Sequence, residues 1–186
     1  MAESQENASR PHHEALPQAF LQLSFALKLW HWVRCGRIDH RAFDIDLMGV
    51  DEERGYSLSS PEGEFPSEDA LICAAENGIA IAFGAASITL WEAVSEHSSR
   101  KPATLQPGIS EAEDVASLIY MLRCCFAHGS AAPKWEMQQK YRRAYHVAGR
   151  VIDLTTRNSE RFDYSHVGGP SMLLVLHDEA IRLGLV

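Results

Sequence analysis

Apolar residues recur at helical spacing in four segments of the chain, residues 14–35, 67–97, 110–129 and 171–183. The second segment follows Ser67, a residue type that is favoured at helix N-caps. It carries the longest apolar stripe, formed by Leu71, Ala75, Ile79, Phe83, Ala86, Leu90 and Val94. Ile72, Ile81, Ile88 and Trp91 broaden this stripe, so we expect the second segment to be the central, largely buried helix.

The third segment, Ser110–Gly129, has recognisable start and stop signals. Ser110 and Glu113 have the spacing of a capping box, in which each side chain bonds the backbone N–H of the other residue. Gly129 stands where a helix C-cap belongs, and Pro133 prevents the helix from continuing. The last turns of this otherwise apolar helix contain a cation, Arg123, and an imidazole, His128.

The remaining segments are shorter and less regular. Residues 38–48 predict a short helix or an irregular arm, and residues 55–66 predict a loop because they contain Pro61, Gly63 and Pro66. Around Gly149 the chain alternates between apolar and polar residues and favours β-branched and aromatic types, which predicts a small β-hairpin. Pro17 is expected in the first turn of the first helix or at its start.

The predicted fold is therefore mainly α-helical, a bundle of four or five helices with a small β-hairpin before the C-terminal helix. Residues 1–13 are polar and aperiodic, which predicts a disordered leader. Residues 14–186 are expected to form a single helical domain, with the hairpin as an extension at about residues 134–156.

Composition narrows the class of protein. A formal net charge of −8 argues against broad, undiscriminating binding to nucleic acid or to anionic membranes. The most apolar stretch, residues 79–91, is shorter than the roughly 20 residues that span a bilayer, and no signal peptide follows Met1. The four cysteines lack paired metal-ligand spacing. We expect a reduced, cytoplasmic protein without membrane contact, metal or cofactor.

The common enzyme motifs for nucleotide binding, zinc hydrolysis and serine hydrolysis are absent from the sequence. The pair that remains is Arg123 and His128. Histidine titrates near neutral pH and transfers protons, whereas arginine keeps its charge and binds phosphate in bidentate fashion. In one ideal helix these two residues lie about 140° apart around the axis and about 7.5 Å along it. A shared site therefore needs a bent helix end or a second copy of the chain.

The string LRCCFAHG, with Arg123 and His128 in an Arg-x4-His pattern at a helix end, resembles the signature of the HEPN superfamily. The resemblance implies a HEPN-like α-helical bundle, a homodimer, and metal-independent endoribonuclease activity of toxin or defence type. Arg123 would then hold the scissile phosphate, and His128 would act as acid or base. A protein antitoxin is an implied partner. Catalytic members often carry a polar residue directly after the arginine, where this chain has Cys124.

Basic and aromatic residues follow this motif, as in surfaces that bind single-stranded nucleic acid. The candidate nucleic-acid-binding residues are Lys134, Trp135, Lys140, Arg142 and Arg143. The alternative is a solvated face of the hairpin. The motif also has two other interpretations. In the first, both residues are structural: Arg123 pairs with a carboxylate from residues 39–53, and His128 caps its helix. In the second, the protein is a non-catalytic module that binds nucleotide, RNA or a protein partner.

Overall fold

The computed structural model describes residues 10–44, 47–51, 56–60, 63–127, 129 and 132–186, with the backbone alone for residues 10–14, 47–51 and 56–60. The chain is mainly helical, with a small antiparallel hairpin before the C-terminal helix, so the predicted fold class is confirmed. Contacts divide it into two compact units. One comprises Met1–Ser24 with Ala80–Val186, and the other comprises Phe25–Ile79.

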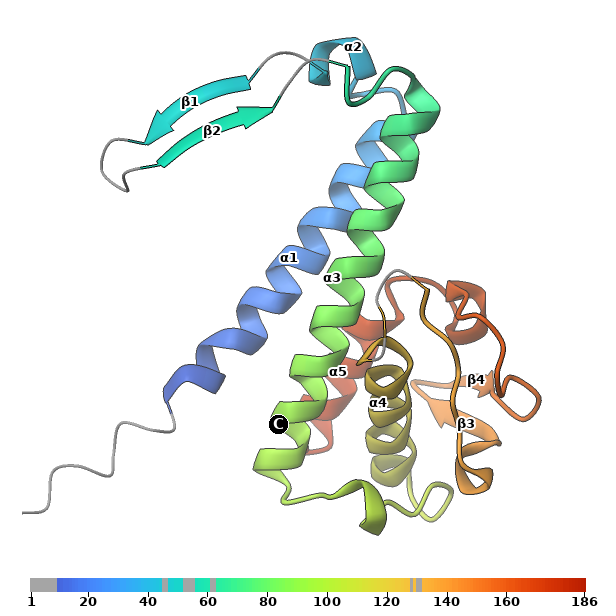
Figure 1. Ribbon diagram of the computed structural model, residues 1–186. Helices are drawn as coiled ribbons and strands as arrows, with labels where there is room; N and C mark the ends of the chain where they lie inside the picture. The colour runs from blue at the N-terminus through green and yellow to red at the C-terminus, as the bar shows by residue number, and fades with distance from the viewer. Residues whose placement is uncertain (1–9, 45–46, 52–55, 61–62, 128, 130–131) are drawn as a thin grey trace, which may run out of the picture. The chain divides into compact units, whose positions relative to one another are not determined.

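The larger unit is built around α4 (Glu111–Ala127), which packs against α5 (Met172–Arg182) and against the strand β3 (Ala144–Val147). These elements surround α4 in Figure 1. Ten of the 17 residues of α4 are buried, so this helix forms the centre of the core. Of the apolar stripe predicted for the C-terminal helix, Met172, Leu173, Leu176 and Ala180 are fully buried, whereas Leu183 is only half-buried.

The second half of α3 (Glu68–His97) packs closely on α4 at Gly84. A Cβ atom at Gly84 would lie 2.8 Å from Cδ1 of Phe126, so only glycine fits here without displacement of a neighbour. The Phe126 ring also meets Phe83 and Phe162, with ring centroids 5.4 and 4.9 Å away. Gly84 therefore permits the close approach of α3 and α4 at this point.

The apolar stripe predicted along α3 is buried throughout, from Leu71 to Val94. Ile81 does not belong to it, because 62% of this side chain is exposed. Residues 79–91, the most apolar stretch of the sequence, are part of the 30-residue helix α3. The most apolar 18-residue window of this helix has a mean hydropathy of 1.6. That helix is long and apolar enough to cross a membrane, but 44% of the window is buried inside the protein. Core helices of soluble proteins meet the same criteria of length and hydropathy.

The smaller unit holds the end of α1 (Arg10–Arg34), the short helix α2 (His40–Phe43) and the first half of α3. Its core is formed by Val33, Leu71 and Ala75, against which Leu29 and Phe65 pack. The N-terminus of α3 is capped as predicted, since the Ala70 N–H donates to Ser67 Oγ at 3.2 Å.

Two further strands lie in this unit, β1 (Leu47–Asp51) and β2 (Tyr56–Ser60), paired antiparallel from Leu47 opposite Ser60 to Asp51 opposite Tyr56. The loop predicted over residues 55–66 is therefore wrong at residues 56–60. Pairing with β1 gives this serine-rich segment its extended structure, and local sequence does not reveal such pairing. Asp44 accepts hydrogen bonds from the N–H groups of Gly63 and Glu64, just after β2.

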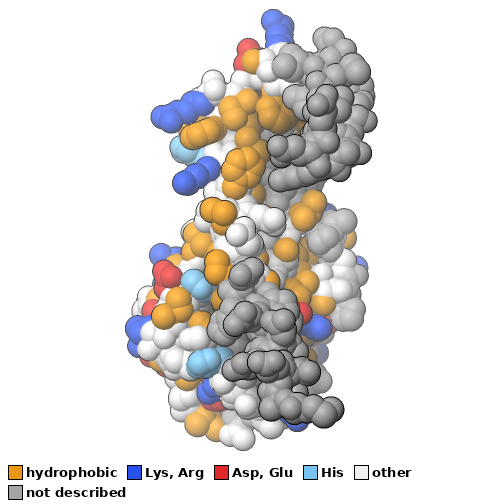
Figure 2. All heavy atoms as spheres, turned by 90° about the vertical axis from the view of Figure 1, so that its left-hand side faces the viewer, with side chains coloured by type: hydrophobic (Ala, Val, Ile, Leu, Met, Phe, Trp, Pro, Cys, Tyr) orange, Lys and Arg blue, Asp and Glu red, His pale blue; other side chains and the backbone are white. Residues whose placement is uncertain are grey.

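Helix α1 begins at Arg10, earlier than the expected start at residue 14, and Pro17 lies inside it rather than in its first turn. Residues 1–9 of the predicted leader lie outside the described residues. One face of α1 keeps large apolar side chains in solvent, with Leu21 63%, Phe25 67% and Trp32 47% exposed. Hydrophobic side chains are visible along this face in Figure 2.

The predicted hairpin before α5 is confirmed as β3 and β4 (Arg150–Asp153), paired antiparallel with Val147 opposite Arg150. The two turn residues, Ala148 and Gly149, have φ angles of 49° and 71°. Positive φ at both positions is the geometry of a type I′ turn, which matches the twist of a hairpin. The hairpin buries one face, which includes Tyr145 and Ile152.

Candidate functional site at the end of α4

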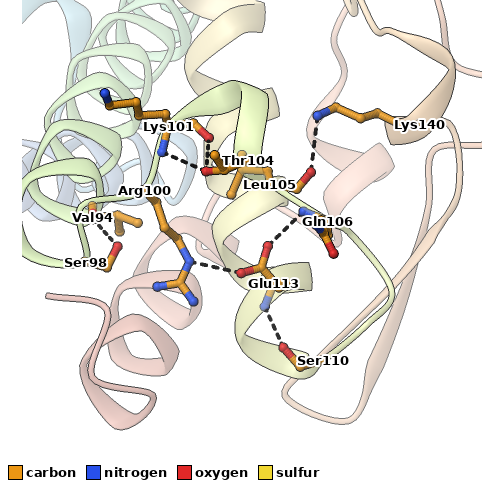
Figure 3. Close-up of polar contacts among 10 residues, drawn as sticks. All are labelled: Val94, Ser98, Arg100, Lys101, Thr104, Leu105, Gln106, Ser110, Glu113 and Lys140. Atoms are coloured by element: carbon orange, nitrogen blue, oxygen red, sulfur yellow. Dashed lines mark hydrogen bonds and ion pairs between the residues drawn. The ribbon is translucent and has the colours of Figure 1, made fainter.

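The N-terminus of α4 shows half of the predicted capping box. Ser110 Oγ accepts from the Glu113 N–H at 3.2 Å. The Glu113 carboxylate does not return to Ser110. It accepts from the Gln106 N–H at 2.9 Å and from Arg100 Nε at 3.2 Å (Figure 3). The prediction of a reciprocal box is wrong because these two donors from the preceding connection take both oxygens of Glu113.

Lys140, one of the predicted nucleic-acid-binding residues, holds the connection between α3 and α4. Its ammonium donates to the carbonyls of Pro102 and Leu105, both at 3.2 Å, and lies 4.8 Å from the centroid of the Tyr141 ring. The bond to Leu105 is drawn in Figure 3. The Tyr141 hydroxyl donates to the same Pro102 carbonyl at 2.9 Å. Lys140 is therefore partly committed to backbone carbonyls.

Arg142 and Arg143 are committed in the same way. Nε and Nη2 of Arg142 both donate to the Met137 carbonyl at 3.2 Å. Arg143 donates to the carbonyls of Ala144 and Pro107, and its guanidinium lies where a Cβ atom at Gly108 would stand. Each of these two arginines uses two of its five N–H donors on backbone carbonyls, which favours the structural interpretation of this basic run.

Trp135 is fully buried, and its indole N–H donates to Nδ1 of His166 at 3.0 Å. The expectation that this ring forms part of a nucleic-acid surface is corrected by its burial, because no face of it is open to a base. Lys134 is exposed, since side chains alternate between solvent and core from Pro133 to Met137. That alternation was a signal for the burial of Trp135. Local sequence gives no signal for the bond to His166, because this residue lies 31 positions from Trp135 in the chain.

The less buried face of α4 carries Tyr120, Arg123 and Cys124. Spacings of three and four residues place them on one side of the helix. Burial, followed by a hydrogen bond with Cys124, raises the pKa of Tyr120 to about 12, and the positive charge of Arg123 acts in the opposite direction. Sequence reasoning missed Tyr120, although its spacing from Arg123 was visible.

Arg123 lies half-buried near the end of α4. Among the residues that the structure describes, no hydrogen bond or ion pair joins its guanidinium to another group. Helix α4 ends at Ala127, and the Gly129 N–H donates to the Phe126 carbonyl at 3.4 Å. His128 lies outside the described residues, so its pairing with Arg123 stays a prediction.

The thiols differ along this helix. Burial raises the pKa of Cys125 to about 12, with the charges of Cys124 and Glu136 acting in the same direction. Cys125 is therefore a protonated, unreactive thiol at neutral pH. Cys124 is half-exposed beside Arg123, and all four cysteines are free. Within the described part of the chain, no group of three or more His, Cys, Asp or Glu side chains has the arrangement of a metal site.

Comparison of the chain with family models, with curated proteins and with solved structures finds no match. The assignment of a function therefore rests on the residues themselves and on their arrangement.

Proposed function

We propose that this protein is a HEPN-like, metal-independent endoribonuclease of toxin or defence type, acting at Arg123 and His128. The observation that carries the proposal is Arg123, a half-buried guanidinium at the end of the central helix without a carboxylate partner among the described residues. A guanidinium in such a place attracts a phosphate group, which it can grip with two parallel hydrogen bonds.

The proposed mechanism assigns one role to each residue. Arg123 holds the scissile phosphate and offsets the negative charge that grows on it during attack by the 2′-hydroxyl. His128 transfers a proton as acid or base. Because His128 follows directly in sequence after Ala127, where α4 ends, we expect the negative end of the helix dipole to favour its protonated form and so the acid role.

The decisive assay incubates unstructured RNA with the protein in EDTA. The variants are Arg123→Ala, Arg123→Lys and His128→Ala, and Arg37→Ala is the control because this exposed arginine lies in the other unit. We expect His128→Ala to lower cleavage by about 10²–10⁴-fold. Arg123→Lys should restore only part of what Arg123→Ala removes, because lysine cannot form the bidentate contact. Equal cutting by all variants, or none by the wild type, contradicts the proposal.

A homodimer is part of the proposal, because one straight helix does not bring Arg123 and His128 together. Mixing and refolding the Arg123→Ala and His128→Ala proteins tests it. If each site takes one residue from each chain, half of the dimers are mixed and each has one intact site, which restores about a quarter of wild-type cleavage. If both residues come from one chain, the mixture stays inactive. Light scattering on the wild type measures the oligomeric state.

The second candidate is a non-catalytic HEPN-like module that binds nucleotide, RNA or a protein. One observation favours it. Cys124, a weak hydrogen-bond donor, directly follows Arg123, where catalytic members of the family often carry a polar residue. RNA binding that needs Arg123, measured without any cleavage by the wild type, would establish this alternative. In either case we propose a cytoplasmic protein, in keeping with its free cysteines, and an antitoxin that covers the end of α4 if it is a toxin.

A further inference from the structure

A hollow of about 480 Å³ lies within the larger unit, between the first half of α1, the last turns of α3, and α5. Its size falls within the range of small-molecule sites, about 300–1,000 Å³. None of its lining residues belongs to α4, so it is separate from the site proposed above and does not depend on it.

The walls of the hollow are largely apolar. Leu16 and Pro17 come from α1, Ala93 from α3 and Ile181 from α5. Ile181 is 54% exposed although it is a large apolar residue, so part of this wall is left in contact with water. A ligand with an apolar body would cover it and remove that contact, which is the main favourable contribution to binding in such a site.

An aromatic surface adds to these walls. The imidazole of His177 lines the hollow and lies against the ring of Phe20, with ring centroids 4.3 Å apart and planes inclined by 32°. The stacking holds the imidazole in place, and its Nδ1 lies 3.5 Å from the Asp178 carboxylate. His177 itself is half-buried in the wall of the hollow.

The charged residues that line the hollow are acidic. Glu92 and Glu96 project from the same face of α3, one turn apart. No lysine or arginine is among the described lining residues. Arg182 directly follows the lining residue Ile181 in sequence. Its guanidinium forms an ion pair with Glu111 at 2.7 Å and donates a hydrogen bond to Glu179. Within the described residues, no hydrogen bond or ion pair involves the Glu92 carboxylate.

We propose that this hollow binds a small amphipathic amine. The ammonium group of the ligand lies at Glu92, and its apolar body covers Leu16, Pro17 and Ile181. The ligand class follows from charge complementarity, because the Glu92 carboxylate, which has no lysine or arginine partner among the described residues, favours a cation and opposes a carboxylate or a phosphate.

The test uses a matched pair of probes, 2-phenylethylammonium and 3-phenylpropionate, which share an apolar body and differ in the sign of their charge. Binding is followed in the intact protein by chemical-shift changes of the backbone amides of Thr89, Ala93 and His177. We expect saturable shifts with the amine and binding at least about fivefold weaker with the carboxylate. Equal affinity for both probes, or no saturable shift with the amine below about 10 mM, overturns the proposal.

Two variants locate the ammonium group and the apolar body. Glu92→Gln keeps the shape of the side chain and removes its charge, so amine affinity should fall about fivefold. Glu136→Gln, an exposed carboxylate of the same unit outside the hollow, should leave it unchanged. Ala93→Trp fills the hollow and should abolish binding while the helical circular dichroism is kept. If Glu92→Gln binds as tightly as Glu136→Gln, the amine does not use Glu92 and the proposal fails.

Discussion

Replacing Gly84 by alanine should destabilise the protein, although alanine is the better helix former. The reason is the contact of α3 with α4, where an added Cβ atom would lie 2.8 Å from Cδ1 and 3.3 Å from Cβ and Cγ of Phe126. Phe126 cannot move aside easily, because only 3% of it is exposed and its ring packs against Phe83 and Phe162.

The magnitude follows from two opposing effects. Overpacking a buried contact costs about 1–3 kcal/mol, whereas a change from glycine to alanine inside a helix gains about 0.5–1 kcal/mol. Gly84→Ala should therefore lower the free energy of unfolding by about 0–2.5 kcal/mol. Gly78 is the matched control, since it lies in the same helix and an added Cβ meets nothing within 4 Å. Gly78→Ala should raise the free energy of unfolding by about 0.5–1 kcal/mol.

Urea denaturation followed by far-ultraviolet circular dichroism measures both variants. Since both changes gain the same helix propensity, their difference isolates the packing cost at Phe126. The double variant Gly84→Ala/Phe126→Ala should recover about 1 kcal/mol relative to the sum of the single changes, because alanine lacks the Cδ1 and Cγ atoms that the added Cβ would meet. If Gly84→Ala stabilises the protein as much as Gly78→Ala does, α3 and α4 are not in contact at this point.

Two further predictions concern buried polar groups. Burial raises the pKa of the Tyr141 hydroxyl to about 12 and that of the Tyr145 hydroxyl further still. Since their unfolded values are near 10.0, the stability they contribute is complete below that pH and is lost as the pH rises through the folded values. The urea midpoint should fall between about pH 10 and about pH 12, and less steeply in Tyr145→Phe; an equal slope in both proteins would contradict this. Asp114, 5% exposed, accepts from the Gly108 N–H at 2.7 Å; Asp114→Asn should cost about 1.5–3 kcal/mol in the same assay, while the exposed Glu136→Gln costs nothing measurable.

The helices were predictable because their apolar residues decide their structure. The stripe from Leu71 to Val94, and the stripe of α5 from Met172 to Ala180, are buried as the spacing indicated. The β3–β4 hairpin was predictable for a similar reason, since Gly149 supplies the positive φ that its turn requires. In each case a local signal in the chain agrees with the packing around it.

The strand β2, the roles of the basic residues and the surroundings of Arg123 were not predictable, because they depend on contacts between residues that are far apart in the sequence. The serine-rich strand β2 is extended because it pairs with β1, and a single segment does not reveal its partner. Lys140 and Arg143 look like ligands for nucleic acid in sequence, but they donate to carbonyls 35 and 36 residues away. The sequence alone does not distinguish a charged side chain that faces solvent from one that hydrogen-bonds the backbone of a loop. For the candidate site, the sequence placed Arg123 on its helix but could not show which groups surround it.

The connection between α3 and α4 has a consequence for how the chain gains its structure during synthesis. Its carbonyls at Pro102, Leu105 and Pro107 are bonded by side chains from Lys140 to Arg143, which leave the ribosome about 36 residues later. Until residues 140–143 emerge, these three carbonyls lack their side-chain hydrogen-bond donors. The connection that leads into the first turn of α4 is then held less firmly. The connection, the start of α4 and the β3–β4 hairpin should therefore become ordered together, as one cooperative folding unit.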